Sequence, residues 1–537
     1  MRFLLTKCLL LRNCKVLWKR FMSGSLSCNP TGITPSQKGL VLGCFANKND
    51  KTGESLSFTD AAKTFNNHVN GKLLKQLMSA KPPPARGEVR TFFGLDDTYP
   101  YVSVVGLDDG CIGYNDVEGI DEKKECIRDA AAIGVKSLLK FELQKIYLET
   151  FSCAESSAEG ASIGMDAYND HKSKNNVKDL PKIDMYESCN WTGWQIGLQK
   201  GSAQNLTRRL QLTPANMLTP IMFAQNAVKL LSNLGVDLQV RGKRYIKTRK
   251  MNALLAVSKG SCEEPQFLEA TYEGCDLNAD PIVLVAPGIT YNSGGLGSLR
   301  SCEEQKMVRG EMSGAASLIA VLRAVSAMKM RLNLKVYIPL AENLIGSGAL
   351  EPGAVITTEK EKTIVVDSTA KVNQLVVADV LTNIVSNKCY TPKMLLDLGP
   401  YCSRSELWST QAVGVFTRNN SLMQSIKVAS MHTGERVWRL PLWRQSTVHT
   451  RSCMEADISN YTPVFGGPAM QAAAFLQEFV PDHIPWVHLE IGGQLITNGL
   501  DAAYLAPGFS GRPTRTLIEL LGQIACEDPS TKSQSCN

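Results

Sequence analysis

Residues 282–286 read Ile-Val-Leu-Val-Ala and are followed at once by Pro287-Gly288-Ile289-Thr290-Tyr291-Asn292-Ser293-Gly294-Gly295. A short apolar run of this kind predicts a strand that is buried on both faces. The glycines that follow allow close backbone approach or positive φ angles, and a loop directly after a buried strand is a common place for a binding site. A purely structural turn would use the same residues.

Strand-like and helix-like runs alternate on both sides of this stretch. The candidate strands are residues 282–286, 334–338, 363–366, 394–396, 413–417 and 487–491, and the candidate helices are 314–328, 375–384, 467–479 and 514–524. Strands separated by helix-length segments predict crossover connections and a mostly parallel central sheet flanked by helices. Ligands of such sheets bind beyond the carboxyl ends of the strands.

The region before residue 210 also has an α/β pattern, with a strand predicted at 101–105 and a helix at 122–139. Pro214 and Pro220 restrict the residues before them and predict a domain boundary after a helix that ends near Leu210. The expected fold class is therefore two-domain α/β, with the smaller domain first. The expected segments are 1–22, a targeting peptide; 23–59, a polar leader; 60–210, the N-terminal α/β domain with a linker helix; 211–527, the C-terminal domain; and 528–537, a polar tail.

The composition of the 537 residues is typical of a globular protein, with 44% apolar and 20% charged residues. Six of the first 22 residues are basic and none is acidic, so the net charge of +7 falls to 7 − 6 = +1 for the remainder. A nearly neutral body argues against a nucleic-acid partner. No apolar run approaches the roughly 20 residues of a membrane span. The sixteen cysteines contain no C-x-x-C pair, so we expect free thiols.

The first 22 residues alternate apolar and basic side chains, which predicts an amphipathic basic helix. Lys7 and Arg12 interrupt the leucines, so a secretory signal is disfavoured and a mitochondrial transit peptide is expected, with cleavage near Phe21. The alternative is a helix that is retained and binds a surface or a partner. The expected location is the mitochondrial matrix.

Several catalytic patterns are absent from the sequence. The spacing of a phosphate-binding loop does not occur, Ser293 lacks the Gly-x-Ser-x-Gly environment, and there is no His-Glu-x-x-His. The six histidines never cluster along the chain, which disfavours a histidine zinc site.

Long stretches between about residues 210 and 525 nevertheless resemble one family in order. They are 213–216, 288–290 with 293–295, 312–316, 433–439, 486–491 and 511–519. On these stretches the chain is similar to the leucyl aminopeptidases, a family of two-metal peptidases. The resemblance implies two divalent ions held by a lysine and several carboxylates, which activate a bridging water. It also implies hexamers that assemble as pairs of trimers through the C-terminal domain.

The family's metal ligands are mostly replaced in this chain. Lysine and aspartate of the first motif correspond to Pro287 and Asn292, and a later aspartate corresponds to Glu311, the one retained carboxylate. The signature Asn-Thr-Asp-Ala-Glu-Gly-Arg aligns with residues 368–374, so that two carboxylates become Ala370 and Val372.

The remaining site positions differ as well. The bicarbonate-binding arginine becomes Gln374, Lys371 adds a positive charge, and Arg300 is the nearest counterpart of the catalytic lysine. The substrate loop Thr-Leu-Thr-Gly is replaced around residues 397–400. A charge of +4 from two dications would therefore meet too few carboxylates. The resemblance is closest to the insect sperm leucyl aminopeptidases, which are mitochondrial and include members with degenerate metal sites.

Three functions follow as hypotheses. The first is a catalytically silent structural protein of sperm mitochondria, without a cofactor, in a homo-hexamer or a hetero-oligomer with related chains. The second is a metal-dependent aminopeptidase with residual or altered activity through Glu311, Asn292 and Arg300, with weakly bound Mn or Zn. The third is a binding module for a peptide or an anion near Arg300 and Lys371.

Three other residues have plain structural interpretations. We expect His488 to be a satisfied core histidine, and Arg512 and Arg515 to pair with acids or cap a helix. Glu311 is equally explained as an acid at a helix N-terminus.

Overall fold

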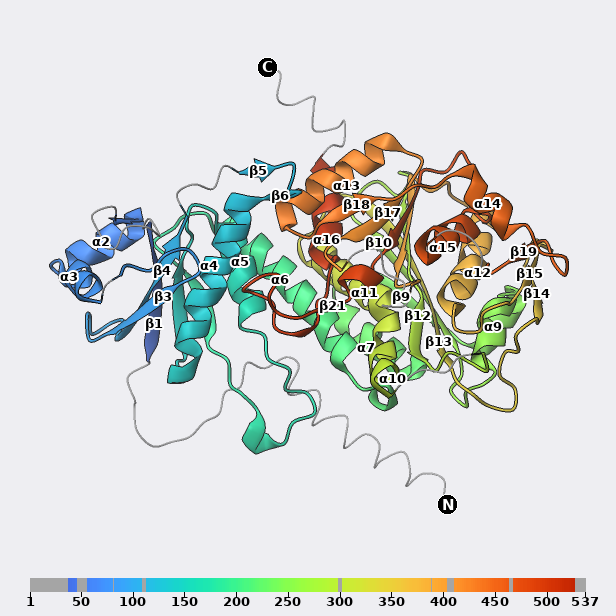
Figure 1. Ribbon diagram of the computed structural model, residues 1–537, viewed down its shortest axis with the longest axis horizontal. Coiled ribbons are helices and arrows are strands. Elements are labelled where there is room, and N and C mark those ends of the chain that lie inside the picture. Colours follow the sequence, from blue (N-terminus) through green and yellow to red (C-terminus); the bar gives the residue numbers. More distant parts are fainter. Residues whose placement is uncertain are drawn as a thin grey trace. The chain divides into compact units, whose positions relative to one another are not determined.

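The computed structural model describes residues 37–45, 56–80, 82–108, 113–297, 302–387, 389–402, 410–462 and 467–526 (Figure 1). The predicted segments 1–22 and 528–537 and the site residue Arg300 lie outside these ranges. Within them, the two-domain α/β fold predicted from the sequence is confirmed.

The N-terminal domain is built on one sheet with the strand order β3-β4-β1-β7-β8, and β2 pairs with β1. Helices α2 and α3 pack on one face, and α4, α5 and the start of α6 pack on the other. The elements are β1 (Lys38–Phe45), β2 (Ser57–Phe58), α2 (Asp60–His68), α3 (Lys72–Ser79), β3 (Val89–Phe93), β4 (Tyr101–Leu107), β5 (Tyr114–Asn115), β6 (Ile120–Asp121), α4 (Glu122–Leu138), β7 (Lys145–Glu149), α5 (Ala154–Gly164), β8 (Lys182–Tyr186) and α6 (Trp191–Leu212).

Strand β1 changes the expected start of this domain. It lies in the middle of the sheet, where it pairs in parallel with both β4 and β7. Its residues Leu40, Val41 and Leu42 are fully buried. The folded domain therefore begins before residue 60, inside the segment that was expected to be a polar leader, because this apolar run fills the centre of the sheet.

The C-terminal domain has a nine-stranded sheet of order β18-β17-β20-β16-β11-β13-β10-β9, with β12 paired to β13. Its strands are β9 (Val236–Arg241), β10 (Gln266–Glu273), β11 (Ile282–Val285), β12 (Gly288–Asn292), β13 (Asn333–Asn343), β16 (Met394–Gly399), β17 (Val413–Phe416), β18 (Val437–Arg439) and β20 (Trp486–Glu490). Outside this sheet lie β14 (Val355–Thr357), β15 (Thr363–Val365), β19 (Ile458–Ser459), β21 (Ile496–Thr497) and β22 (Gly508–Phe509).

The helices of this domain connect the strands. They are α7 (Pro220–Leu231), α8 (Lys243–Thr248), α9 (Asn252–Ser258), α10 (Cys302–Met307), α11 (Ser313–Ala327), α12 (Val372–Ser386), α13 (Asn420–Thr433), α14 (Arg444–Thr450), α15 (Pro468–Gln477) and α16 (Thr514–Cys526). Short 3-10 turns include η1 (Leu139–Phe141), η2 (Lys174–Asn176), η3 (Ala215–Met217), η4 (Val308–Met312) and η6 (Gly492–Gln494).

The pairing of the sheet agrees with the prediction in its centre and differs at its edges. Strands β13, β11, β16 and β20 run parallel, whereas β10 and β9 on one side and β17 on the other pair antiparallel. The strand predicted at 363–366 was assigned to this sheet, but it is β15 of a separate three-stranded sheet with β14 and β19. Burial alone cannot tell which sheet a three-residue strand joins.

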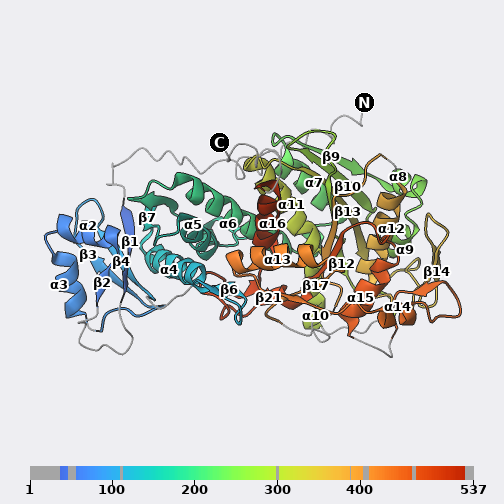
Figure 2. The same cartoon turned by 90° about the horizontal axis from the view of Figure 1, so that it is seen from above.

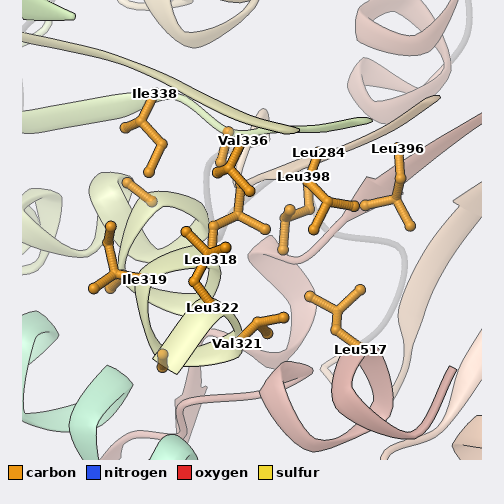
Figure 3. Packing of buried hydrophobic residues seen from close by; sticks show 14 of the residues in the cluster. Leu284, Leu318, Ile319, Val321, Leu322, Val336, Ile338, Leu396, Leu398 and Leu517 are labelled. Carbon is orange, nitrogen blue, oxygen red and sulfur yellow. The ribbon is translucent and has the colours of Figure 1, made fainter. Parts of the chain in front are cut away.

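Both faces of the central sheet are covered by helices (Figure 2). Ile282 and Leu284 pack with α6, α7, α11 and α16, whereas Val283 and Val285 point the opposite way and pack with α9, α12 and α15. This alternation explains why the strand is apolar at every position. Figure 3 shows α11 packed on the first face, with Leu318 and Leu322 among the strand leucines and valines.

Helix α11 approaches the sheet closely at its first turn. A Cβ placed on Gly314 would lie 2.3 Å from the carbonyl oxygen of Leu398, so only glycine permits this packing. This contact holds the start of α11, and η4 before it, against the carboxyl end of β16.

Two further predictions concern the chain as a whole. In the part that the structure describes, none of the helices is long and apolar enough to cross a membrane. The ten cysteines described there are free thiols, which agrees with the expectation from their spacing.

Candidate functional site

The candidate site, made by Asn292, Glu311, Asn343 and Asn373, lies at the carboxyl ends of strands β12 and β13. Asn292 is the last residue of β12, and Asn343 is the last residue of β13. Glu311 lies in η4, and Asn373 lies in the first turn of α12. Four segments that are far apart in the sequence thus bring their polar side chains together.

The side-chain amide of Asn292 is held on both of its atoms. Its Nδ2 donates to Glu311 Oε2 at 2.7 Å and to the carbonyl oxygen of Ala370 at 3.0 Å. Its Oδ1 accepts from the backbone N–H of Gly294 at 2.9 Å and from Nδ2 of Asn343 at 2.8 Å. The backbone donor of Gly294 fixes which atom is oxygen, so Nδ2 is the atom that faces Glu311.

A second amide donates to the same carboxylate oxygen. Asn373 Nδ2 lies 3.1 Å from Glu311 Oε2 and 2.6 Å from the carbonyl oxygen of Pro400. Since a carbonyl can only accept, the orientation of this amide is also fixed. Asn373 Oδ1 is buried and has no hydrogen-bond partner. Glu311 therefore receives hydrogen atoms from two amides, and no second carboxylate takes part in these contacts.

These residues do not fit a pair of divalent ions. A metal needs oxygen or nitrogen lone pairs directed at it, and the two nitrogen atoms at Glu311 Oε2 direct hydrogen atoms instead. Ala370 has no side-chain donor, and Val372 is fully buried in the apolar cluster beneath α12. Pro287 is buried against Gly399. Among the described residues, no group of three or more His, Cys, Asp or Glu side chains is placed to hold a metal ion.

The other predicted positions separate into different surroundings. Gln374 is buried and donates to the carbonyl oxygen of Asn460, away from Glu311. Lys371 Nζ lies 3.4 Å from the carbonyl oxygen of Tyr401. Asn292 therefore contacts both Glu311 and Ala370, whereas the hydrogen bond of Gln374 is made to Asn460.

The stretch around residues 397–400, which was expected to be a loop, begins inside β16, where Asp397 forms a buried polar network with β20. Asp397 accepts from Trp486 Nε1 at 2.7 Å and from the hydroxyl of Tyr401 at 3.1 Å, and its Oδ1 lies 2.6 Å from His488 Nδ1. The Nε2 atom of His488 is buried without a partner. His488 is therefore a core histidine, as expected, but only one of its two ring nitrogens is satisfied.

Glu490 lies beside this network and is also buried. Burial raises its pKa, although the His488 ring and the backbone N–H groups of Gly492 and Tyr401 oppose the shift. The hydroxyl of Tyr401 is buried next to Asp397, and both effects raise its pKa. Asp397, His488, Glu490 and Tyr401 thus stabilise the contact between β16, β20 and the residues that follow β16.

The two arginines of the C-terminal segment pair with acids, which confirms that expectation. Arg515 Nη1 lies 2.9 Å from Glu159 Oε2, and Arg512 Nη1 lies 3.8 Å from Asp501 Oδ2.

The sequence analysis did not identify Asn343, Asn373 or Asp397 as site residues. The one usable signal for Asn373 was its place inside the aligned signature stretch, next to two lost ligands.

Comparisons with known proteins agree with this architecture. The model of the cytosol aminopeptidase family catalytic domain matches residues 205–518, and that of the family's N-terminal domain matches residues 41–175. The cytosol aminopeptidase of Bos taurus is 37% identical over 492 residues, which cover 90% of this chain and 92% of that protein. The cytosol aminopeptidase of Homo sapiens is 36% identical over 511 residues, with coverages of 94% and 95%.

Solved structures show the same fold. The bottromycin maturation enzyme BotP in complex with Mn superposes with a TM-score of 0.76 at 26% identity, over 91% of this chain and all of that chain (100%). The cytosol aminopeptidase from Coxiella burnetii gives a TM-score of 0.72 at 20% identity, over 91% and 98% of the two chains. At 20% identity, the similarity to the Coxiella burnetii structure shows a shared fold and nothing more.

Proposed function

This chain belongs to the cytosol aminopeptidase family, and on that premise we propose that it is a catalytically silent member with a structural role. The fold of the family is retained across both domains, while the residues that would hold two metals are replaced. Because a fold does not determine an activity, the function has to be argued from the site.

The observation that carries this proposal is the pair of amide donors on Glu311. Asn292 and Asn373 both direct Nδ2 at the one retained carboxylate. A dication placed there would meet the positive ends of two N–H dipoles and a single carboxylate. These two hydrogen bonds occupy the side of Glu311 Oε2 that faces Asn292 and Asn373 with donors rather than with metal-binding lone pairs.

The structural role includes a location and an assembly. We propose that the chain acts in the mitochondrial matrix after removal of residues 1–22, because this segment is basic and has no acid. We further propose a homo-hexamer or a hetero-oligomer with related chains. Loss of metal ligands leaves such packing possible, since interfaces depend on shape and apolar area.

The alternative function is a metal-dependent aminopeptidase with residual activity. It is supported by Glu311, which keeps its carboxylate at an ancestral metal position, and by the identity to proteins named as cytosol aminopeptidases. In this alternative, Mn or Zn binds weakly at Glu311, with carbonyl oxygens such as those of Ala370 and Pro400 nearby.

Metal analysis and peptidase assays of the purified chain distinguish the two functions. We expect no stoichiometric metal after dialysis against Mn²⁺ or Zn²⁺, and no hydrolysis of leucyl amides above the buffer rate. The bovine cytosol aminopeptidase, assayed in parallel, is the positive control. Two ions per chain, or hydrolysis that disappears in the Glu311→Gln variant, would support the alternative.

A gain-of-function variant tests the same site from the other direction. It combines Pro287→Lys, Asn292→Asp, Ala370→Asp, Val372→Glu and Gln374→Arg. We expect this variant to bind metal more tightly than the unmodified chain, because it restores three carboxylates around Glu311. Equal metal binding by the two chains would show that these positions are not the missing ligands.

A further inference from the structure

A cavity of about 490 Å³ lies in the N-terminal domain, and none of the residues of the candidate site lines it. Helix α2, the loop between β3 and β4, strand β7 and the end of β8 surround it. The lining residues are Thr64, Phe65, His68, Asp96, Thr98, Tyr99, Tyr147, Met185, Tyr186 and Glu187. This volume lies within the range of small-molecule sites, which runs from roughly 300 to 1,000 Å³.

Aromatic rings make up much of the wall. Tyr99 meets three other rings edge to face, at centroid distances of 6.4 Å from Phe65, 5.5 Å from Tyr147 and 5.8 Å from Tyr186. The three tyrosines are partly buried against the core of the domain. These edge-to-face contacts hold the rings in fixed positions against one another in the wall of the cavity.

One of these rings already binds an ammonium group of the chain. Lys145 Nζ lies 4.5 Å from the centroid of the Tyr147 ring, while it also pairs with Asp184 at 2.7 Å. Lys145 is not among the residues that line the cavity. The contact shows that the Tyr147 ring makes a cation–π interaction with a side chain of the domain itself.

The charges on the wall are predominantly negative. Asp96 is fixed by the backbone N–H groups of Thr98 at 3.0 Å and Tyr99 at 3.1 Å. Glu187 follows β8 with a φ of 43°, an uncommon conformation for a residue other than glycine. Among the described lining residues, only His68 can carry a positive charge, and its Nε2 lies 3.4 Å from Asp96 Oδ1.

The hydroxyls of Tyr99 and Tyr186 keep their protons and therefore add no negative charge. Burial raises the pKa of Tyr99, and the neighbouring tyrosine and acids raise it further. Burial, together with the charge of Glu187 and a hydrogen bond to it, raises the pKa of Tyr186. The two carboxylates are consequently the charged groups of this wall, beside neutral aromatic rings.

We propose that this cavity binds a small organic cation that carries a quaternary or alkylated ammonium group. The rings attract such a group through their quadrupoles, and Asp96 and Glu187 supply the opposite charge. A bare metal ion is disfavoured, because the described residues contain no cluster of three metal-binding side chains. An anion is disfavoured as well, because the carboxylates of Asp96 and Glu187 would repel it.

Calorimetric titration of the full chain with choline tests this proposal. The matched neutral probe is 3,3-dimethylbutan-1-ol, which has the shape of choline with carbon in place of nitrogen. We expect choline to bind at least about tenfold more tightly than the neutral alcohol, which corresponds to about 1.4 kcal/mol. Equal affinities, or no heat with either probe, would overturn the proposal.

Variants of the wall locate the bound cation. We expect Tyr99→Leu to weaken choline binding about tenfold or more, and Tyr99→Phe, which keeps the ring, to stay within about threefold. Tyr245→Leu is the matched control, because Tyr245 belongs to an aromatic stack beside Arg241 and Arg249 in the C-terminal domain. Unchanged affinity in Tyr99→Leu would refute this site.

The two carboxylates provide a second test that leaves the rings in place. We expect Glu187→Gln and Asp96→Asn each to weaken choline binding about threefold or more and to leave binding of the neutral alcohol unchanged. This pair of variants decides the question even if Tyr99→Leu fails to fold. Full choline affinity in the Asp96→Asn, Glu187→Gln double variant would contradict the assigned role of charge.

Discussion

A single nitrogen atom at residue 292 changes what the site can bind. With aspartate there, two carboxylates would face each other and would require a cation between them. With asparagine, Nδ2 replaces one of those oxygens and donates to Glu311 Oε2 at 2.7 Å. This donor stabilises the Glu311 carboxylate, since hydrogen bonds to an ionised acceptor are stronger than those between neutral groups.

This argument gives the first prediction. Asn292→Asp places a second carboxylate against Glu311, so we expect the variant to unfold about 2–4 kcal/mol more easily at pH 8. Two adjacent carboxylates can share a proton, so the loss should shrink as the pH falls to 5. Urea unfolding at both pH values measures this difference.

The control for this variant is Asn175→Asp, since Asn175 is exposed. We expect it to change stability by less than about 0.5 kcal/mol at either pH. If Asn292→Asp is as stable as the parent chain at pH 8, the amide of Asn292 is not the group that stabilises Glu311.

The identity of the site residues was only partly accessible from the sequence. Asn292, Glu311 and Ala370 could be grouped because they correspond to metal-ligand positions of the family that the sequence resembles. Asn343 and Asn373 could not, because an amide becomes a partner of Glu311 only through distances that the folded chain sets. The hydrogen bond from Gln374 to the carbonyl oxygen of Asn460 could not be predicted either, since residue 460 is far away in the sequence.

At the scale of elements, helices α9 and α12 are joined by a buried carboxyl group. Asp379 in α12 accepts the backbone N–H of Leu254 in the first turn of α9, at 2.9 Å. Burial raises the pKa of Asp379 to about 7, although backbone hydrogen bonds from Leu254 and Ala253 oppose the shift. The protonated form is therefore favoured in the folded chain.

The sign of the pH effect follows from this shift. A carboxyl group with a folded-state pKa near 7 and a lower value in the unfolded chain stabilises the fold at low pH and loses that effect as the pH rises through 7. Asp379→Asn cannot ionise, so at pH 8 we expect it to be more stable than the parent chain, by on the order of 3 kcal/mol. At pH 4 the two chains should be nearly equal.

Thermal unfolding between pH 4 and 8 checks this prediction, with Asp60→Asn in the exposed first turn of α2 as the control. We expect the control to follow the parent chain at every pH. A constant difference between Asp379→Asn and the parent chain across this range would show that Asp379 does not titrate in the folded state.

The crossing of α4 and α5 gives another prediction at this scale. A Cβ on Gly160 would lie 2.1 Å from the carbonyl oxygen of Arg128, so the two helices touch through backbone atoms. Alanine would favour the helix itself by about 1 kcal/mol. The overlap outweighs this gain, and we expect Gly160→Ala to destabilise the chain by about 2–3 kcal/mol in urea unfolding.

A second helical glycine is the matched control. Gly522 in α16 has room for a Cβ, whose nearest neighbour within 4 Å would be Met330 Cε at 3.6 Å. We expect Gly522→Ala to be neutral or to stabilise by up to about 1 kcal/mol. If both variants behave alike, helix propensity rather than the close contact determines the result.

The elements themselves were predicted unequally well. The helix expected at 375–384 is α12 (Val372–Ser386), and the strand expected at 282–286 is β11 (Ile282–Val285). Both could be predicted because a long periodic or apolar run is a strong signal of secondary structure. Strand β1 was missed although Leu40, Val41 and Leu42 form an apolar run, since its flanks read as a polar leader. The pairing of β15 with β14 and β19 depends on tertiary packing, so the local sequence could not predict which sheet this strand joins.

At the scale of the whole molecule, a buried network of charges links the two domains. Glu159 in α5 contacts Arg128 of α4 at 2.5 Å and Arg515 of α16 at 2.9 Å. Lys200 of α6 reaches the same group, pairing with Glu155 and with Glu519 of α16. Burial would raise the pKa of Glu159, but the three cations outweigh burial and hold that pKa below its usual range.

The final prediction removes the centre of this network. Glu159→Ala leaves Arg128 and Arg515 buried without their shared carboxylate, so we expect the free energy of unfolding to fall by about 3–5 kcal/mol. Urea unfolding followed by circular dichroism measures this loss. Glu118→Ala, which breaks the exposed pair with Arg436, is the control, with an expected loss below about 1 kcal/mol. An unchanged midpoint in Glu159→Ala would show that the Glu159 carboxylate does not stabilise the contact between the domains, and that other contacts, such as the Lys200–Glu519 pair, are sufficient.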